Sequence, residues 1–178
     1  MKFKSSKVTN IKVSDIEGMD PIDITIDDQG AGKGRITFSC EGKTYSSFWP
    51  AMGTDISRFV VRIDDDYLRS NVGGPSANVD DIEAFKKYLM DLISEIKEEE
   101  ELNAVEIGEC IHAVMLNETV ESIGHSLSNS FYAAAGMRGP WDLEVPRMPN
   151  YKYKRFTEIA AIVRKALKWN LDQNGGDA

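Results

Sequence analysis

Cysteine and histidine are scarce in this chain, which has two of each among its 178 residues. Cys40 and Cys110 cannot build the disulfide framework of a small secreted domain, and no Cys-x-x-Cys pair is present to begin a zinc site. Both cysteines are predicted to be reduced core residues, which is typical of a cytosolic protein. The sequence therefore predicts no metal site and no cofactor.

Long apolar runs are also missing. No stretch approaches the roughly 18 residues that a membrane-spanning helix needs, and residues 1–7 lack the apolar core of a signal peptide. A hydrophobic content of 42% and a charged content of 28% are ordinary for a soluble globular protein. We therefore expect a cytoplasmic protein that does not enter the membrane, long enough for one domain with a sizeable core.

Two segments resemble active-site motifs but depart from them at necessary positions. Gly30-Ala-Gly-Lys-Gly34 lacks the spacing of a phosphate-binding P-loop, and a predicted strand follows it instead of a helix. Gly124-His-Ser-Leu-Ser128 ends in serine where the nucleophile elbow needs glycine, and its surroundings are helical. We interpret the first as a hairpin turn and predict that the protein is not an enzyme. One enzymatic alternative stays open, a small metal-dependent enzyme that uses Asp64–Asp66 or His125.

Charge is distributed unevenly along the chain. The formal net charge is -8, but residues 79–121 hold 13 acidic and 3 basic residues, whereas residues 147–168 hold 7 basic residues and 1 acidic residue. Such asymmetry indicates either an interaction surface or two segments that face each other within the molecule.

Alternation of apolar and polar residues predicts a sheet within the first 50 residues. Ile22–Ile26 and Ile36–Cys40 alternate strictly, Glu41–Lys43 is a short hairpin loop, and Tyr45–Trp49 is the return strand. Lys7–Val13 alternates loosely, so the antiparallel meander has three strands or four. The side chains predicted to be buried in it are Ile22, Ile24, Ile26, Ile36, Phe38 and Trp49.

Helix starts are marked by capping residues, which accept hydrogen bonds from the first backbone N–H groups of a helix. Asp64 either lies within the first helix or caps a second one. The other predicted starts are Thr54, Asn78 with Asp81 three residues later, and Asn103 with Glu106 three residues later.

The predicted fold is a single α+β domain over residues 1–172. A sheet within residues 1–53 packs against four to five helices, because amphipathic elements must bury their apolar faces against one another. The segments after the sheet are helices over 54–132, a loop over 133–150, a terminal helix over 151–170 and a flexible tail over 173–178.

The segment from Gly34 to Gly53, GRITFSCEGKTYSSFWPAMG, followed by Asp65-Asp-Tyr-Leu68, resembles small proteins encoded in phages and prophages of enteric bacteria. Those proteins carry a similar strand, a similar aromatic-x-x-Met-Gly end and a similar Tyr-Leu helix. Pro149–Tyr153 and the final helix are also similar to that group. The resemblance covers about a fifth of the chain and brings no active-site residue with it. It implies a phage accessory protein.

The leading hypothesis is a non-enzymatic phage or prophage accessory protein that binds a host protein in the host cytoplasm, in its concrete form a host-defence inhibitor. An acidic helical surface can occupy a site that normally receives nucleic acid, because it presents carboxylates where phosphates would lie. The alternative is a nucleic-acid-associated regulatory factor that uses the basic C-terminal helix, with Lys152, Lys154 and Arg155 as contacts. The predicted partner-binding residues are Asp80, Asp81, Glu83, Asp91, Glu95 and Trp141.

Overall fold

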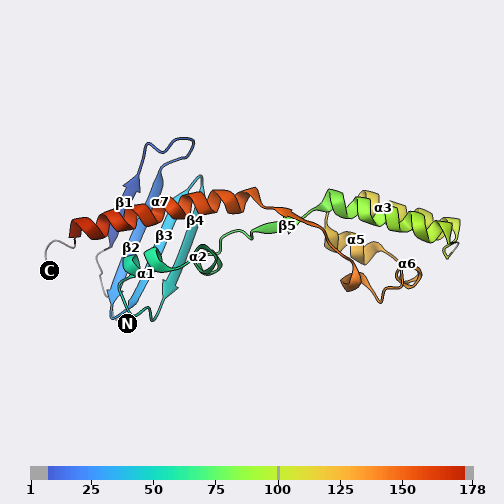
Figure 1. Cartoon of the computed structure of the whole chain (residues 1–178), viewed down its shortest axis with the longest axis horizontal. Coiled ribbons are helices and arrows are strands. Elements are labelled where there is room, and N and C mark those ends of the chain that lie inside the picture. Colours follow the sequence, from blue (N-terminus) through green and yellow to red (C-terminus); the bar gives the residue numbers. More distant parts are fainter. Residues whose placement is uncertain (1–7, 100, 175–178) are drawn as a thin grey trace, which may run out of the picture. The chain divides into compact units, whose positions relative to one another are not determined.

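The computed structural model describes residues 8–99 and 101–174 of the chain (Figure 1). Its contacts group into two compact units. One comprises residues 1–77 and 150–178, which we call the sheet unit, and the other comprises residues 78–149, which we call the helical unit. The prediction of one folding domain over residues 1–172 stays a prediction.

An antiparallel meander forms the sheet unit, with strands in the order β1-β2-β3-β4. The predicted α+β class with an N-terminal antiparallel meander is thereby confirmed. The predicted hairpin turn over Gly30–Gly34 is present but shorter, because only Ala31 and Gly32 lie between the strands, and both have positive φ (50° and 70°). Gly32 is further constrained because a Cβ there would lie 2.9 Å from the backbone nitrogen of Gly53. The strands are β1 (Thr9–Val13), β2 (Ile22–Gly30), β3 (Lys33–Cys40) and β4 (Lys43–Trp49).

The core of the sheet unit lies between the sheet and helices α1 (Ile56–Arg62), α2 (Asp65–Val72) and α7 (Tyr151–Asn174). Because side chains alternate between the faces of a strand, every second residue of β2 and β3 enters this core. Figure 1 shows α7 running across one face of the sheet. The prediction of burial is confirmed for all six residues, each at most 4% exposed: Ile22, Ile24, Ile26, Ile36, Phe38 and Trp49.

Aspartates begin the two short helices of the sheet unit. The N-cap of α1 is Asp55, whose side chain accepts a hydrogen bond from the Arg58 backbone N–H at 2.9 Å, so the prediction of Thr54 is wrong by one residue. Asp64 caps a separate helix, α2, and accepts from the Tyr67 backbone N–H at 2.7 Å. Of the two alternatives for Asp64, the structure has the second.

The helical unit has its own buried core, contributed by all four of its α-helices. Its first and last segments pair as a two-stranded antiparallel ribbon. The elements of its described residues are β5 (Asn78–Asp80), α3 (Ile82–Glu98), α4 (Ala104–Leu116), α5 (Val120–Ser126), α6 (Asn129–Ala134), a 3-10 turn η1 (Pro140–Asp142) and β6 (Arg147–Pro149).

Two helix starts in this unit test the predicted caps. The N-cap of α3 is Asp81 itself, and the predicted capping box with Asn78 is wrong because Asn78 pairs with Pro149 in the ribbon. Asn103 and Glu106 form the predicted capping box of α4, with both reciprocal hydrogen bonds present.

The later boundaries differ from the prediction in three places. Thr119 and Ser128 each cap a helix, so the helical region that ends near 132 is divided into α5 and α6. The predicted loop over 133–150 contains η1 and β6, and the terminal helix extends to Asn174. The first two residues of the predicted tail are therefore helical, and residues 175–178 lie outside the described residues. None of the helices in the described part of the chain combines the length and apolarity that a membrane crossing needs.

Candidate functional site

The two units carry very different charge. The helical unit holds 15 acidic and 5 basic residues, a net charge of -10, whereas the sheet unit holds 14 acidic and 16 basic residues, a net charge of +2. The acidic excess seen in the sequence therefore belongs to one compact body. A body of this charge attracts cationic partners over distances of about a Debye length.

The acidic residues predicted on α3 fall into two groups. Glu83, Asp91 and Glu95 are exposed and follow one another at spacings of eight and four residues, which places them on one side of the helix. Asp81 instead caps α3 by accepting from the Ala84 backbone N–H at 3.0 Å. Asp80 lies 3.6 Å from Arg147 of the partner strand in the ribbon. The first three are exposed to solvent, and Asp80 and Asp81 stabilise the local fold.

Tyr88 of α3 is influenced by carboxylates from two segments. The pKa of Tyr88 is raised mainly because the side chain is partly buried, and further by the negative charges of Glu144 and Glu95. Glu144 follows η1 in the chain, so an acidic residue far from α3 in the sequence acts on this helix.

Helix α4 also carries exposed apolar side chains that sequence reasoning missed. Its inward stripe is buried in the core of the helical unit, but Val105, Met115 and Leu116 are exposed by 70%, 64% and 66%. A groove of about 710 Å³ has two of these side chains in a mixed lining, which also contains Glu109, His112, Asn117 and Ser126. The available signal was that α4 is apolar nearly all round, which is typical of a helix covered on every side.

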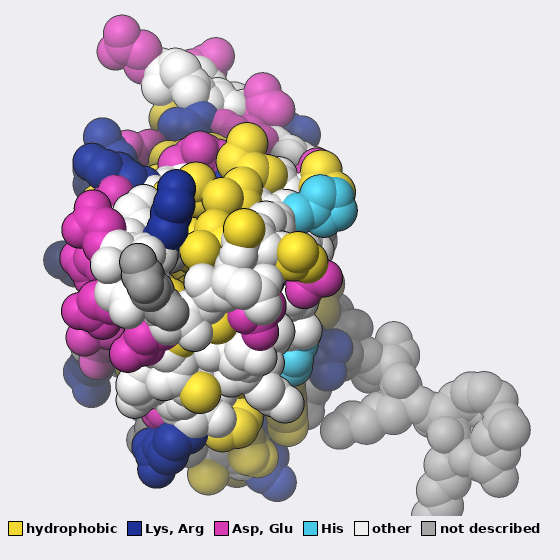
Figure 2. Space-filling model, turned by 90° about the vertical axis from the view of Figure 1, so that its right-hand side faces the viewer, with side chains coloured by type: hydrophobic (Ala, Val, Ile, Leu, Met, Phe, Trp, Pro, Cys, Tyr) yellow, Lys and Arg dark blue, Asp and Glu magenta, His cyan; other side chains and the backbone are white. Residues whose placement is uncertain are grey.

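Figure 2 shows one face of the molecule. Hydrophobic side chains collect in its upper middle and right, where a histidine side chain adjoins them, and acidic side chains line its left side. Glu109 belongs to the lining of the α4 groove. Acidic and apolar side chains thus occur together in this groove.

Trp141, the aromatic residue predicted to bind a partner, projects from η1. Its side chain is 74% exposed. The ring lies over Gly139, where an added Cβ would be only 2.7 Å from a ring carbon, so a larger residue at this position would displace the exposed ring. Arg138 and Asp142 close the turn around it with an ion pair at 3.2 Å. An exposed tryptophan held on a closed turn is typical of interface anchors.

The basic C-terminal segment is less available for nucleic acid than the sequence suggests. Arg155 donates hydrogen bonds to Glu41 in the β3–β4 turn, to the Gly18 backbone carbonyl at 2.7 Å and to Glu158 at 3.2 Å. These hydrogen bonds therefore link α7 to two loops of the sheet unit. Lys152 and Lys154 are exposed.

A second arginine of α7 has a similar structural role. Arg164 donates to the backbone carbonyls of Val60 at 3.2 Å and Ile63 at 3.0 Å, and it pairs with Asp65. These carbonyls lie at the C-terminal end of α1, where a cation is favourable for the helix dipole. Basic residues of α7 thus serve two purposes, and the sequence alone does not separate them.

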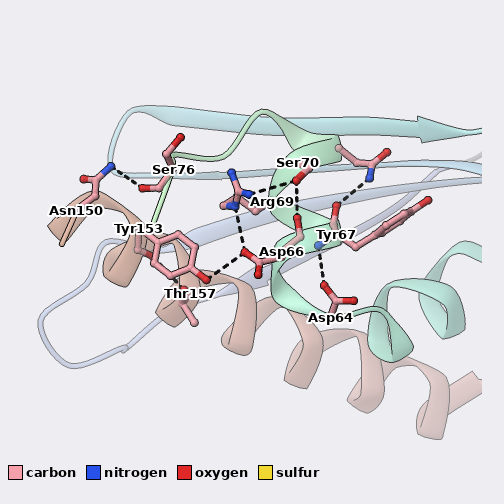
Figure 3. Close-up of polar contacts among 10 residues, drawn as sticks. Asp64, Asp66, Tyr67, Arg69, Ser70, Ser76, Asn150, Tyr153 and Thr157 are labelled. Atoms are coloured by element: carbon pink, nitrogen blue, oxygen red, sulfur yellow. Dashed lines mark hydrogen bonds and ion pairs between the residues drawn. The ribbon is translucent and has the colours of Figure 1, made fainter. Parts of the chain in front are cut away.

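The carboxylates of Asp64–Asp66 have separate partners instead of one shared point, as Figure 3 shows for Asp64 and Asp66. Asp64 caps α2, Asp65 pairs with Arg164, and Asp66 lies 3.4 Å from an arginine one turn later. His125 is exposed in the last turn of α5. Over residues 8–99 and 101–174, no three His, Cys, Asp or Glu side chains are grouped so that they could hold a metal ion.

Comparison with known proteins gives the family. A family profile described as "Phage family" (Phage_phiTE_072) matches residues 1–169. The chain belongs to this phage family. A search of the curated proteins and a search of the solved structures each gave no significant match.

Arg164 offers a stability test in this phage protein. Arg164→Met leaves two carbonyls and one carboxylate without their donor, and we expect it to lower the free energy of unfolding by about 1–3 kcal/mol. Lys168→Met, at an exposed position of the same helix, is the matched control and is expected to change stability by less than about 0.5 kcal/mol. Urea titrations of both variants provide the measurement. Equal losses in the two variants would contradict a structural role for Arg164.

The Glu41–Arg155 pair predicts how the stability of this phage protein depends on pH. Hydrogen bonds from Arg155 hold the pKa of Glu41 below its ordinary value of 4.5. A carboxylate with a depressed folded pKa stabilises the fold above its unfolded pKa, and this contribution is lost as the pH falls through the folded pKa. Glu41→Gln should therefore melt lower than wild type at pH 7, and the difference should shrink toward pH 3. Melting curves at both pH values measure it, with Glu17→Gln as control. A difference that stays constant with pH would count against the pair.

Proposed function

We propose that this member of the phage family is a non-enzymatic accessory protein that binds a host protein in the host cytoplasm through its helical unit. One observation carries the proposal: the helical unit combines a net charge of -10 with exposed apolar side chains and a groove on α4. A solvated acidic surface alone needs no partner. Apolar side chains that are exposed by 64% to 70% are what a partner would cover.

The two parts of this surface contribute differently to binding. Carboxylates on α3 steer a cationic partner toward the helical unit and raise the association rate. Contact of the partner with the α4 groove and Trp141 then buries surface of both proteins and slows dissociation, because aromatic and aliphatic anchors supply most of the binding energy of an interface. The partner is expected to present a basic surface with apolar side chains at its centre.

A host protein that normally receives nucleic acid has such a basic surface. Carboxylates on the helical unit would then occupy the positions of phosphates, and the consequence for the host protein is inhibition. A host-defence nuclease or regulator is the concrete form of this proposal, in keeping with the phage family.

The alternative, a nucleic-acid-associated factor, has one supporting observation. Lys43, Lys152 and Lys154 surround a cavity of about 390 Å³ between the β3–β4 turn and the start of α7. Glu41 and Glu158 lie in the same lining and pair with its arginine, which lowers the local positive charge. We favour protein binding because the helical unit has the larger charge and an apolar surface beside it.

Affinity purification tests the proposal. The tagged protein is incubated with a nuclease-treated extract of an enteric bacterium, and retained proteins are eluted in steps of increasing salt and identified by mass spectrometry. We expect a basic host protein that elutes as salt rises, since exposed charges are screened within about 10 Å at 0.1 M salt. Retention only before nuclease treatment would favour the nucleic-acid alternative, and retention of no protein would contradict host-protein binding.

A further inference from the structure

Strand β1 is an edge of the sheet. Within the described residues it pairs with β2 alone, in a register that places Ile11 opposite Ile24 and Val13 opposite Ile22. Alternate backbone N–H and C=O groups on its outer side are therefore without a strand partner. Unpaired edges of this kind are templates for a further strand.

An apolar groove accompanies this edge. It has a volume of about 470 Å³ and lies between β1 and the flank of α7. Ile22 and Ile24 are almost completely buried beneath the helices, whereas Ile11 and Val13 of β1 are only half-buried. The apolar face of the sheet therefore extends beyond the area that the helices bury. The α7 residues that line the groove are Ile162, Lys165, Ala166 and Trp169.

We propose that this groove binds an extended segment of a partner protein, which adds to β1 as a further strand. Backbone hydrogen bonds to the β1 edge would fix the segment, and every second side chain would enter the groove against Trp169, which is 58% exposed. Lys165 is exposed in the groove lining, whereas Lys12 of the edge strand already pairs with Asp23 at 3.4 Å, so the segment carries an acidic residue for Lys165 among its apolar ones. This site lies within the sheet unit and is independent of the surface proposed for the helical unit.

A second copy of the chain fits the groove less well. A symmetric pair would place β1 against β1. Strand β1 carries no acidic residue that could face Lys165 of the other copy. The exposed Lys165 of the groove therefore favours an acidic segment over another copy of β1.

Peptide selection tests this site directly. The full-length protein is immobilised and panned against a displayed library of random 12-residue peptides. Enriched peptides should have apolar residues at every second position, acidic residues between them, and no proline in the paired region, because proline cannot donate to the ladder. Enrichment at helical spacing, or no enrichment, would overturn the proposal.

The strongest enriched peptide is then synthesised, and its affinity is measured by fluorescence anisotropy. Trp169→Ala should weaken binding by about tenfold or more, whereas Trp141→Ala, which removes an exposed tryptophan of the helical unit, should leave it unchanged. Hydrogen exchange should show new protection at the β1 backbone amides when the peptide is bound. Binding that is indifferent to Trp169, or that leaves β1 unprotected, would overturn the assignment.

Two other occupants of the groove would give distinguishable results. Sedimentation would show a dimer that Trp169→Ala dissociates if a second copy fills the groove. A peptide that binds only after removal of residues 1–7 would show that the chain's own N-terminal segment fills it. Either result would overturn the assignment to a partner segment.

Discussion

Replacing Phe38 with alanine is expected to lower the free energy of unfolding of the sheet unit by about 3–5 kcal/mol, which is the usual loss when a fully buried aromatic side chain is truncated. Phe38 is completely buried and packs against Tyr45 and Phe156, with ring centroids 5.2 and 6.3 Å away. Truncation therefore removes contacts to β4 and to α7 at once. The cavity that remains lies where the sheet meets its covering helix.

Phe48→Ala provides the matched control for this prediction. Phe48 lies on β4 with its side chain 41% exposed, and Arg35 stacks over the ring at 5.9 Å. Its truncation should lower stability by about 1–2 kcal/mol at most, because the side chain is partly exposed and leaves no enclosed cavity. Urea titrations of both variants give the comparison. A loss below 1 kcal/mol for Phe38→Ala would show that the assigned core face of β3 is wrong.

The sheet could be predicted from the sequence because strand alternation is a local signal. Ile36 and Phe38 lie two residues apart on one face, and this pattern alone states which side is buried. The first helix start was predicted one residue early because Thr54 and Asp55 are both good N-caps, and only the geometry at Arg58 decides between them. Propensity thus locates an element and leaves its boundary to hydrogen bonding.

The separate helical unit could not be predicted in the same way. The apolar stripes of α3 and α4 say that each helix has a buried side, but the same stripes would serve for packing on the sheet. The partner of a buried stripe is set by long-range contacts, which periodicity does not contain. The exposed apolar side chains of α4 were missed for a related reason: an apolar residue on a helix is ordinarily assigned to the core.

The charge of α7 does not by itself tell which of its basic residues have structural partners. Arg155 and Lys154 are neighbours in the sequence, yet Arg155 donates hydrogen bonds to Glu41 and Gly18, whereas Lys154 is exposed. The structure therefore changes the variants that can test nucleic-acid binding. Arg155→Glu would disturb the sheet unit, so only lysines of this cluster are suitable.

Reversal of Glu83, Asp91 and Glu95 to lysine is expected to reduce partner binding by on the order of 100-fold or more, mainly through a slower association rate. All three side chains are exposed on α3, so the fold should survive, because exposed charges contribute little to stability. Surface plasmon resonance with the purified partner at several salt concentrations measures the rates. Wild-type association should slow steeply with salt, and the variant should have lost that dependence.

The matched control reverses three exposed acidic residues of the sheet unit, Glu17, Asp20 and Asp172, to lysine. It carries the same total change of charge, and it should leave binding within a few-fold of wild type because the affected side chains belong to the other unit. Lys152→Glu with Lys154→Glu tests the nucleic-acid alternative, in which this pair would be the damaging one. If only Trp141→Ala removes binding while both charge sets are silent, the interface is apolar, and the concentration of acidic residues in the helical unit serves solvation instead of recognition.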